Sequence, residues 1–224
     1  MLRIGVVGLG HLGSIHLKNL QTIPQISISG ICDTKPEDEI PDTLDQIPYF
    51  SKLDDLINVS DAIFLITPTV SHFDVAQKVI RSGKHIFIEK PITHSLEEAY
   101  LLRDLLETHP VKVQVGHVER FNPVFTAVKD LELNPMFIEG HRLSVFNPRG
   151  TDVSVVLDLM IHDIDILLKL VKVPIESIQS SGVSIVSDTP DITNARLTFA
   201  NGAVANLTAS RMSMKKMRKL RLFQ

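Results

Sequence analysis

Short apolar runs alternate with amphipathic segments over the first half of the chain. The runs that predict strands buried on both faces are residues 2–7, 26–32, 62–66, 85–88 and 111–115. The segments with helical periodicity between them are residues 12–23, 51–57, 70–81 and 95–109. Because strand and helix alternate throughout, residues 1–116 are predicted to form an α/β domain with a doubly wound parallel sheet.

Polar residues at the ends of these segments predict where the helices begin and end. Ser95 with Glu98 three positions later is typical of a capping box, and Ser51 is a candidate N-cap for the second helix. Gly83 is expected to end the third helix.

The pattern changes after residue 116. Helices are predicted at residues 122–131 and 155–172, and strands at residues 136–146, 177–186, 193–199, 203–210 and 217–223. Asn201-Gly202 is a strong signal for a hairpin between two of these strands. Residues 117–224 are therefore predicted to form an α+β domain with an open, mostly antiparallel sheet and helices on one face.

Composition narrows the class of protein. With 44% hydrophobic and 22% charged residues among 224, the chain is neither disordered nor fibrous. No apolar run reaches the length of a membrane span, and the N-terminus leads into a strand, so a cytoplasmic protein without membrane contact is expected. The single cysteine, Cys32, cannot form an internal disulfide, and a net charge of -3 gives no general attraction to nucleic acid.

A glycine-rich turn follows the first strand. Gly8, Gly10 and Gly13 form a G-x-G-x-x-G pattern, and Asp33 ends the second strand about 20 residues further along. This order predicts a dinucleotide site whose pyrophosphate lies at a helix N-terminus. Asp33 would accept hydrogen bonds from the adenosine ribose, which favours NAD, whereas nearby Lys35 leaves NADP open.

Lys90 stands at the end of an apolar strand, between Glu89 and Pro91. A lysine is most often a solvated surface charge, but here a stiff support presents the amine where the crevice of a doubly wound sheet opens. Lys90 is therefore a candidate general base or alkoxide-stabilising donor.

A second candidate group lies on an apolar helix. Asp158 and His162 are one helical turn apart and are expected to share a face with Asp165. A histidine in such a place is commonly a core residue, but acids around it need partners if they are buried. A metal site is not expected, because three ligands on one helix lack a clear fourth.

Together these motifs resemble the Gfo/Idh/MocA oxidoreductase family along the whole chain. The resemblance implies catalytic roles for Lys90, His162 and Asp158 in proton transfer to and from a sugar hydroxyl. It implies a cofactor site formed by Gly8, Gly10, His11, Leu12, Gly13, Asp33, Thr67, Pro68, His72, Glu89 and Lys90.

Residues 116–123 look more narrowly like members that act on C3 of UDP-N-acetylglucosamine. That likeness implies substrate contacts from Arg120 and Asn122 in addition to Asp158 and His162. The expected function is hydride transfer between a nicotinamide cofactor and a sugar or UDP-sugar, in a homo-oligomer that associates through the C-terminal sheet. The alternatives are a non-catalytic cofactor sensor and a nucleic-acid binder that uses the basic residues 215–221.

The sequence departs from the family pattern in two ways. Val155-Val156 and Met160 stand where members often have glycine, so the substrate pocket is expected to differ in shape. Family chains usually run further, which implies an incomplete second domain, a final strand at residues 217–223 that forms an unpaired edge of the sheet, and weak activity of this chain.

Overall fold

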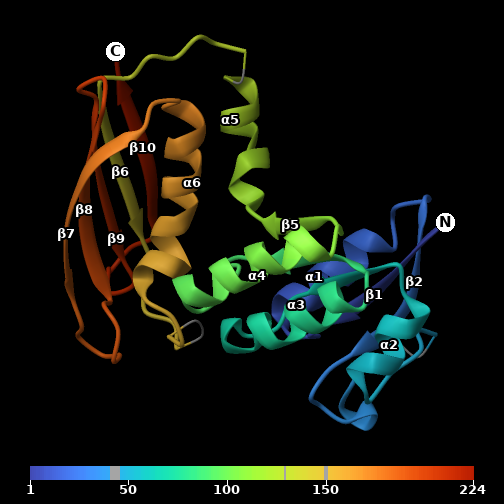
Figure 1. Cartoon of the computed structure of the whole chain (residues 1–224). Coiled ribbons are helices and arrows are strands. Elements are labelled where there is room, and N and C mark those ends of the chain that lie inside the picture. The colour runs from blue at the N-terminus through green and yellow to red at the C-terminus, as the bar shows by residue number, and fades with distance from the viewer. Residues whose placement is uncertain (41–45, 129, 149–150) are drawn as a thin grey trace. The chain divides into compact units, whose positions relative to one another are not determined.

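The computed structural model describes residues 1–40, 46–128, 130–148 and 151–224. The chain divides into two compact units, Met1–Gly116 and His117–Gln224, and each is described by itself (Figure 1).

The first unit contains a five-stranded sheet in the order β2-β1-β3-β4-β5, with every neighbouring pair parallel. Its strands are β1 (Leu2–Val7), β2 (Ile26–Cys32), β3 (Ala62–Leu65), β4 (His85–Glu89) and β5 (Val113–Gly116). Val7 lies opposite both Cys32 and Leu65, so the carboxyl ends of the first three strands meet at one edge. The predicted parallel sheet is confirmed, and this edge is where ligands bind in such folds.

Helices follow each strand of this unit except the last. They are α1 (His11–Leu20), α2 (Leu53–Val59), α3 (His72–Arg81) and α4 (Leu96–Thr108), with short 3₁₀ turns at Glu37–Glu39 and Thr69–Ser71. The capping box of Ser95 and Glu98 is confirmed. Ser51 as a cap is wrong: Lys52 precedes α2 and makes no side-chain cap, and Asp54 and Asp55 place negative charge in the first turn instead.

Two apolar clusters hold the helices on this sheet. One packs Leu17 and Leu20 of α1 on Ile4 and Val6. The other packs residues of α2, α3 and α4 on alternating positions of the strands, which include Val7, Ile63 and Ile88. Burial on both faces explains why the strands read as continuous apolar runs.

The second unit contains a five-stranded sheet in the order β10-β6-β9-β8-β7. Its strands are β6 (Phe137–Leu143), β7 (Ile175–Val183), β8 (Ile192–Phe199), β9 (Val204–Ser210) and β10 (Met217–Phe223). Only β6 and β9 among these neighbours are parallel, so the predicted mostly antiparallel sheet is confirmed. The Asn201-Gly202 hairpin is also confirmed, with Gly202 at a φ of 83°.

Helix α6 (Ile161–Leu170) lies against one face of this sheet (Figure 1). The segment predicted as one helix over residues 155–172 begins instead with a π-helical turn, Val156–Met160. The helix predicted at residues 122–131 is shorter: α5 (Pro123–Ala127) ends at Ala127, and a 3₁₀ turn (Val118–Phe121) precedes it. Residue 129 lies outside the described residues.

The final strand forms one edge of the sheet. β10 pairs with β6 along its whole length, from Met217 opposite Leu143 to Phe223 opposite Phe137. Its other side pairs with no described strand, so the predicted unpaired edge at the final strand is confirmed, whereas the pairing with β6 joins segments far apart in the sequence and no local pattern reveals it.

Candidate functional site

The three glycines of the turn after β1 have distinct surroundings. Gly8 has a φ of +94°, and a Cβ at Gly13 would come within 1.9 Å of the Gly8 carbonyl oxygen. A Cβ at Gly10 would meet nothing within 4 Å. Gly8 and Gly13 therefore allow the turn and the close helix, whereas the space at Gly10 is open for a ligand, as a pyrophosphate requires.

A cavity of about 920 Å³ lies beside this turn, within the first unit. Its lining includes Gly8, Gly10, Asp33, Lys35, Tyr49, Thr67 and Pro68. The exposed residues His11 and Leu12 form the start of α1 next to Gly10. The cavity has the size and position of a dinucleotide site at the carboxyl edge of the sheet.

Asp33 occupies the expected place at the end of β2. Its Oδ2 accepts a hydrogen bond from the Leu9 N–H at 2.5 Å, and its Oδ1 accepts one from the Lys35 N–H at 3.0 Å. These contacts hold the carboxylate at the cavity wall. The Tyr49 hydroxyl donates to the carbonyls of Asp33 and Lys35, so Tyr49 supports this loop, a role that no pattern in the sequence indicated.

His72 has a different position from the one implied by the resemblance. Its side chain is buried, with 1% exposure, and its Nδ1 and Nε2 lie 2.9 Å from the carbonyl oxygens of Pro91 and Thr67. Both ring nitrogens are therefore occupied by the chain itself. His72 joins the loop after β3 to the loop after β4, and through Thr67 it contacts the lining of the cavity.

Lys90 follows β4, and the preceding Glu89 is held in place by two contacts. Its Oε1 lies 2.7 Å from His16 Nε2, and its Oε2 accepts the Lys90 N–H at 3.1 Å. The His16 ring packs near Phe64 and Phe87, with ring centroids at 6.2 and 5.4 Å. Sequence reasoning missed His16, because only the fold brings α1 and the end of β4 together.

In the second unit the candidate residues lie where the π-helical turn passes into α6. Asp158 belongs to the turn and His162 to α6. The turn is wider than an α-helix, which changes the facing of Asp158 relative to a regular helix. The acids around His162 have basic partners: Asp163 accepts from Arg142 at 2.7 Å, and Asp165 accepts from Arg120.

The electrostatics of Asp165 are set by its neighbours. Burial alone would raise its pKa, but the Arg120 hydrogen bonds and the nearby His117, Arg120 and His162 charges lower it below the usual range. Asp165 is therefore a fixed negative charge beside His162.

Arg120 and Asn122 are engaged inside the chain. Arg120 holds Asp165, and the Asn122 side chain caps α5 by accepting the Val124 N–H at 3.1 Å. The Arg120 side chain remains 47% exposed beside this ion pair, and the substrate contacts implied for Arg120 and Asn122 stay a prediction.

Comparison with known proteins places the chain in a family. A model described as an oxidoreductase family with an NAD-binding Rossmann fold matches residues 2–117, and a GFO/IDH/MocA C-terminal domain model matches residues 137–223. The chain belongs to the Gfo/Idh/MocA oxidoreductase family. As a member of it, the protein is a nicotinamide-dependent dehydrogenase.

Several Gfo/Idh/MocA relatives match nearly the full chain. UDP-N-acetylglucosamine 3-dehydrogenase of Acidithiobacillus ferrooxidans is 36% identical over 99% of this chain and 71% of its own length. A solved structure of that enzyme has a TM-score of 0.90, with 34% identity over 99% of this chain and 73% of that one. The scyllo-inositol 2-dehydrogenase (NAD(+)) of Bacillus subtilis is 30% identical over 95% of this chain and 68% of its own.

The described residues were also compared with the requirements of a metal site and of a membrane span. They contain no group of three or more His, Cys, Asp or Glu side chains placed to hold a metal ion. Within the same part of the chain, no helix is long and apolar enough to cross a membrane.

Proposed function

We propose that the protein transfers hydride between NAD and C3 of UDP-N-acetylglucosamine. The observation that carries this proposal is the 36% identity over 99% of the chain to an enzyme of that name. A member of the family acting on a free sugar or inositol is the nearest competing assignment, because an inositol dehydrogenase is 30% identical.

The preference for NAD rests on Asp33. Its carboxylate lies at the wall of the cavity and is held there by two N–H groups. A carboxylate in that position accepts hydrogen bonds from ribose hydroxyls and repels a 2′-phosphate. Titration with NAD and NADP tests this directly: comparable dissociation constants would contradict the preference, and Asp33→Ser should narrow the difference between them.

The remaining chemistry is assigned to Lys90, His162 and Asp158. When bound, the nicotinamide accepts or returns the hydride. We assign the proton of the reacting hydroxyl to Lys90 Nζ or the His162 ring, and the orientation of the sugar to Asp158. Glu89, His16 and His72 support Lys90, whereas Asp165 places a negative charge beside His162.

The first prediction concerns substrate and catalytic residues together. The full chain is screened for cofactor reduction with UDP-N-acetylglucosamine, other UDP-sugars, free sugars and inositols. We expect turnover of the UDP-sugar, and Lys90→Ala and His162→Ala should each lower kcat by ~10²-fold with little change in cofactor affinity. The double variant should lose less than the product of both effects if the two groups act on one proton.

The screen separates the competing assignments. Turnover of an inositol alone would show that the substrate is an inositol and not the UDP-sugar. An unchanged kcat in both single variants would contradict the catalytic roles of Lys90 and His162. Tight cofactor binding with no turnover of any compound would identify a non-catalytic sensor instead.

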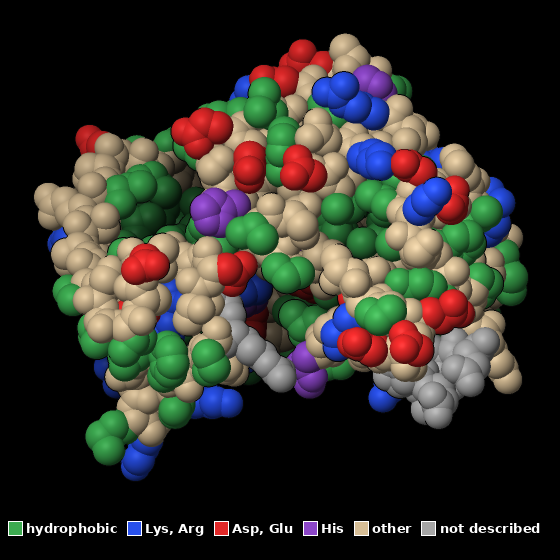
Figure 2. All heavy atoms as spheres, turned by 90° about the horizontal axis from the view of Figure 1, so that it is seen from below, with side chains coloured by type: hydrophobic (Ala, Val, Ile, Leu, Met, Phe, Trp, Pro, Cys, Tyr) green, Lys and Arg blue, Asp and Glu red, His purple; other side chains and the backbone are tan. Residues whose placement is uncertain are grey.

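We do not assign nucleic-acid binding to the basic residues 215–221. Arg218 forms an ion pair with Glu119 and Arg221 with Glu139, both at 3.3 Å. On the face drawn in Figure 2, described acidic and basic side chains are scattered among hydrophobic ones. The two ion pairs of Arg218 and Arg221 favour local pairing over a surface that follows a phosphate backbone.

A further inference from the structure

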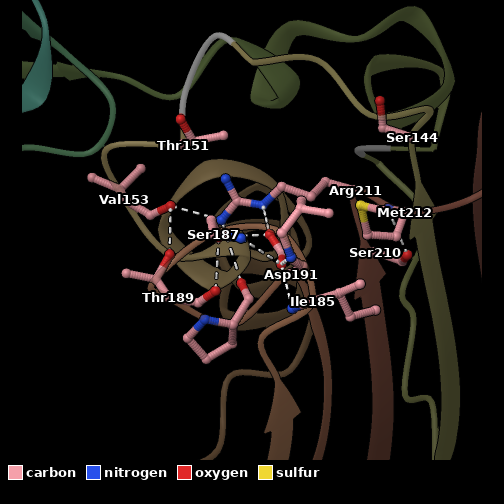
Figure 3. Close-up of polar contacts among 12 residues, drawn as sticks. Ser144, Thr151, Val153, Ile185, Ser187, Thr189, Asp191, Ser210, Arg211 and Met212 are labelled. Atoms are coloured by element: carbon pink, nitrogen blue, oxygen red, sulfur yellow. Dashed lines mark hydrogen bonds and ion pairs between the residues drawn. The ribbon is translucent and has the colours of Figure 1, made fainter.

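A buried polar cluster in the second unit has no role in the assignments above. Its centre is Asp191, which has 0% exposure, and Arg211, which has 3% (Figure 3). Arg211 Nε lies 3.3 Å from Asp191 Oδ1. Two opposite charges buried together cost free energy unless further hydrogen bonds satisfy them, so the remaining contacts of both groups matter.

The Asp191 carboxylate binds the loop between β7 and β8 through hydrogen bonds. Its Oδ2 accepts the N–H groups of Ile185, Val186 and Ser187 at 2.7, 2.8 and 3.2 Å, and its Oδ1 accepts the Ser187 hydroxyl at 2.7 Å. These bonds to the ionised form hold the pKa of Asp191 well below its usual range. The ionised carboxylate therefore holds both the loop and Arg211.

Arg211 reaches from the end of β9 to the segment that leads into the candidate helix. Its Nη2 donates to the Val153 carbonyl at 2.7 Å and lies 3.3 Å from the Pro190 carbonyl. The Val155 N–H donates to the same Pro190 carbonyl at 3.0 Å. Figure 3 shows Val153, Thr189 and Asp191 gathered around the Arg211 guanidinium.

The helix that begins here has no side-chain cap of its own. Val155 is the N-cap of the π-helical turn, and no side chain there accepts a helix N–H. An uncapped helix start is held by whatever fixes the residues before it. In this chain those residues are fixed by Arg211 and by the Pro190 carbonyl, immediately before the turn that carries Asp158.

We propose that Arg211 and Asp191 are positioning residues for the dehydrogenase reaction: they fix the entry of the helix that carries Asp158 and His162. The proposal rests on the proposed function for the roles of those two side chains. Arg211 acts through the Val153 carbonyl and Asp191 acts through Arg211, and neither has to touch the substrate.

The test compares Arg211→Lys and Arg211→Met with Arg196→Lys and Arg196→Met. Arg196 is a matched control, because it lies exposed on the neighbouring strand β8 and its side chain donates to Asn206. The readouts are kcat, the KM for the sugar, the cofactor dissociation constant, far-UV circular dichroism and the NMR signals of the His162 ring, assigned with His162→Gln.

We expect Arg211→Lys to lower kcat by ~10-fold or more, since small displacements of catalytic groups have large effects. The His162 signals should shift, while the cofactor dissociation constant should stay within about twofold, because the glycine-rich turn belongs to the other unit. Arg211→Met should show a larger effect, and both Arg196 variants should match the parent chain.

Folded Arg211 variants with unchanged kcat or unchanged His162 signals would overturn the proposal. So would loss of the fold in both of them, which would make the cluster purely a stabilising element. If the parent chain turns over no sugar, the proposed function fails, and the His162 signals alone then decide whether Arg211 positions the helix.

Discussion

At the residue scale, the His72 ring joins two loops of the first unit. Its Nδ1 and Nε2 lie 2.9 Å from the carbonyl oxygens of Pro91 and Thr67, and the side chain is buried. We predict that His72→Ala lowers the melting temperature of the chain, because it removes both contacts and leaves a cavity, whereas His85→Ala at an exposed position should have little effect. Equal melting temperatures of His72→Ala and the parent chain would contradict this supporting role.

A second prediction at this scale concerns pH and Asp165. Its folded-state pKa is lowered, so it stabilises the fold above its unfolded pKa of about 4, and this contribution is lost as pH falls through the folded value. Asp165→Asn should therefore lower the free energy of unfolding more at about pH 7 than at about pH 3. Urea unfolding followed by circular dichroism measures the free energy of unfolding of the parent chain and of Asp165→Asn at each pH. A loss of free energy that is the same at the two pH values would exclude this role.

At the element scale, two glycines of the turn between β1 and α1 are expected to have different roles: Gly13 in the stability of the fold and Gly10 in cofactor binding. A Cβ at Gly13 would collide with the Gly8 carbonyl, whereas one at Gly10 would enter open space. Gly13→Ala should destabilise the first unit by roughly 1–3 kcal/mol, the usual cost of overpacking.

Gly10→Ala is the matched variant of that prediction. It should keep the melting temperature and weaken cofactor binding by ~10-fold or more, because the methyl group occupies the approach of the pyrophosphate. Thermal melting and cofactor titration of both variants test the pair, and equal loss of stability in the two would show that the turn has no open ligand face.

At the scale of the whole molecule, we propose that the chain self-associates through its second sheet. Helix α6 covers one face of this sheet (Figure 1), and Phe137 and Phe223 pack against each other at 5.9 Å with 39% and 50% exposure. Exposed apolar side chains on a sheet favour a protein partner.

Light scattering should accordingly give a mass above the 25.0 kDa of one chain. Phe137→Ser with Phe223→Ser should reduce that mass, whereas Leu168→Ser, at an exposed position of α6, should leave it unchanged. A single species of monomer mass in the parent chain would refute the association.

The sequence by itself determined the elements and the chemistry that depends on neighbouring residues. Apolar runs, the glycine spacing, the capping box of Ser95 and the Asn201-Gly202 hairpin are local, so each was predictable before any contact was known. The position of Asp33 after β2 follows from the same alternation, because parallel strands end at one edge of the sheet.

Only the tertiary structure decided which distant groups meet. The pairing of β10 with β6, the contact of His16 with Glu89, and the reach of Arg211 to Val153 each join segments far apart in the chain. The π-helical turn before α6 also escaped prediction, since its apolar pattern is that of an ordinary helix. Such contacts depend on packing and buried charge pairing, which periodicity and spacing do not encode.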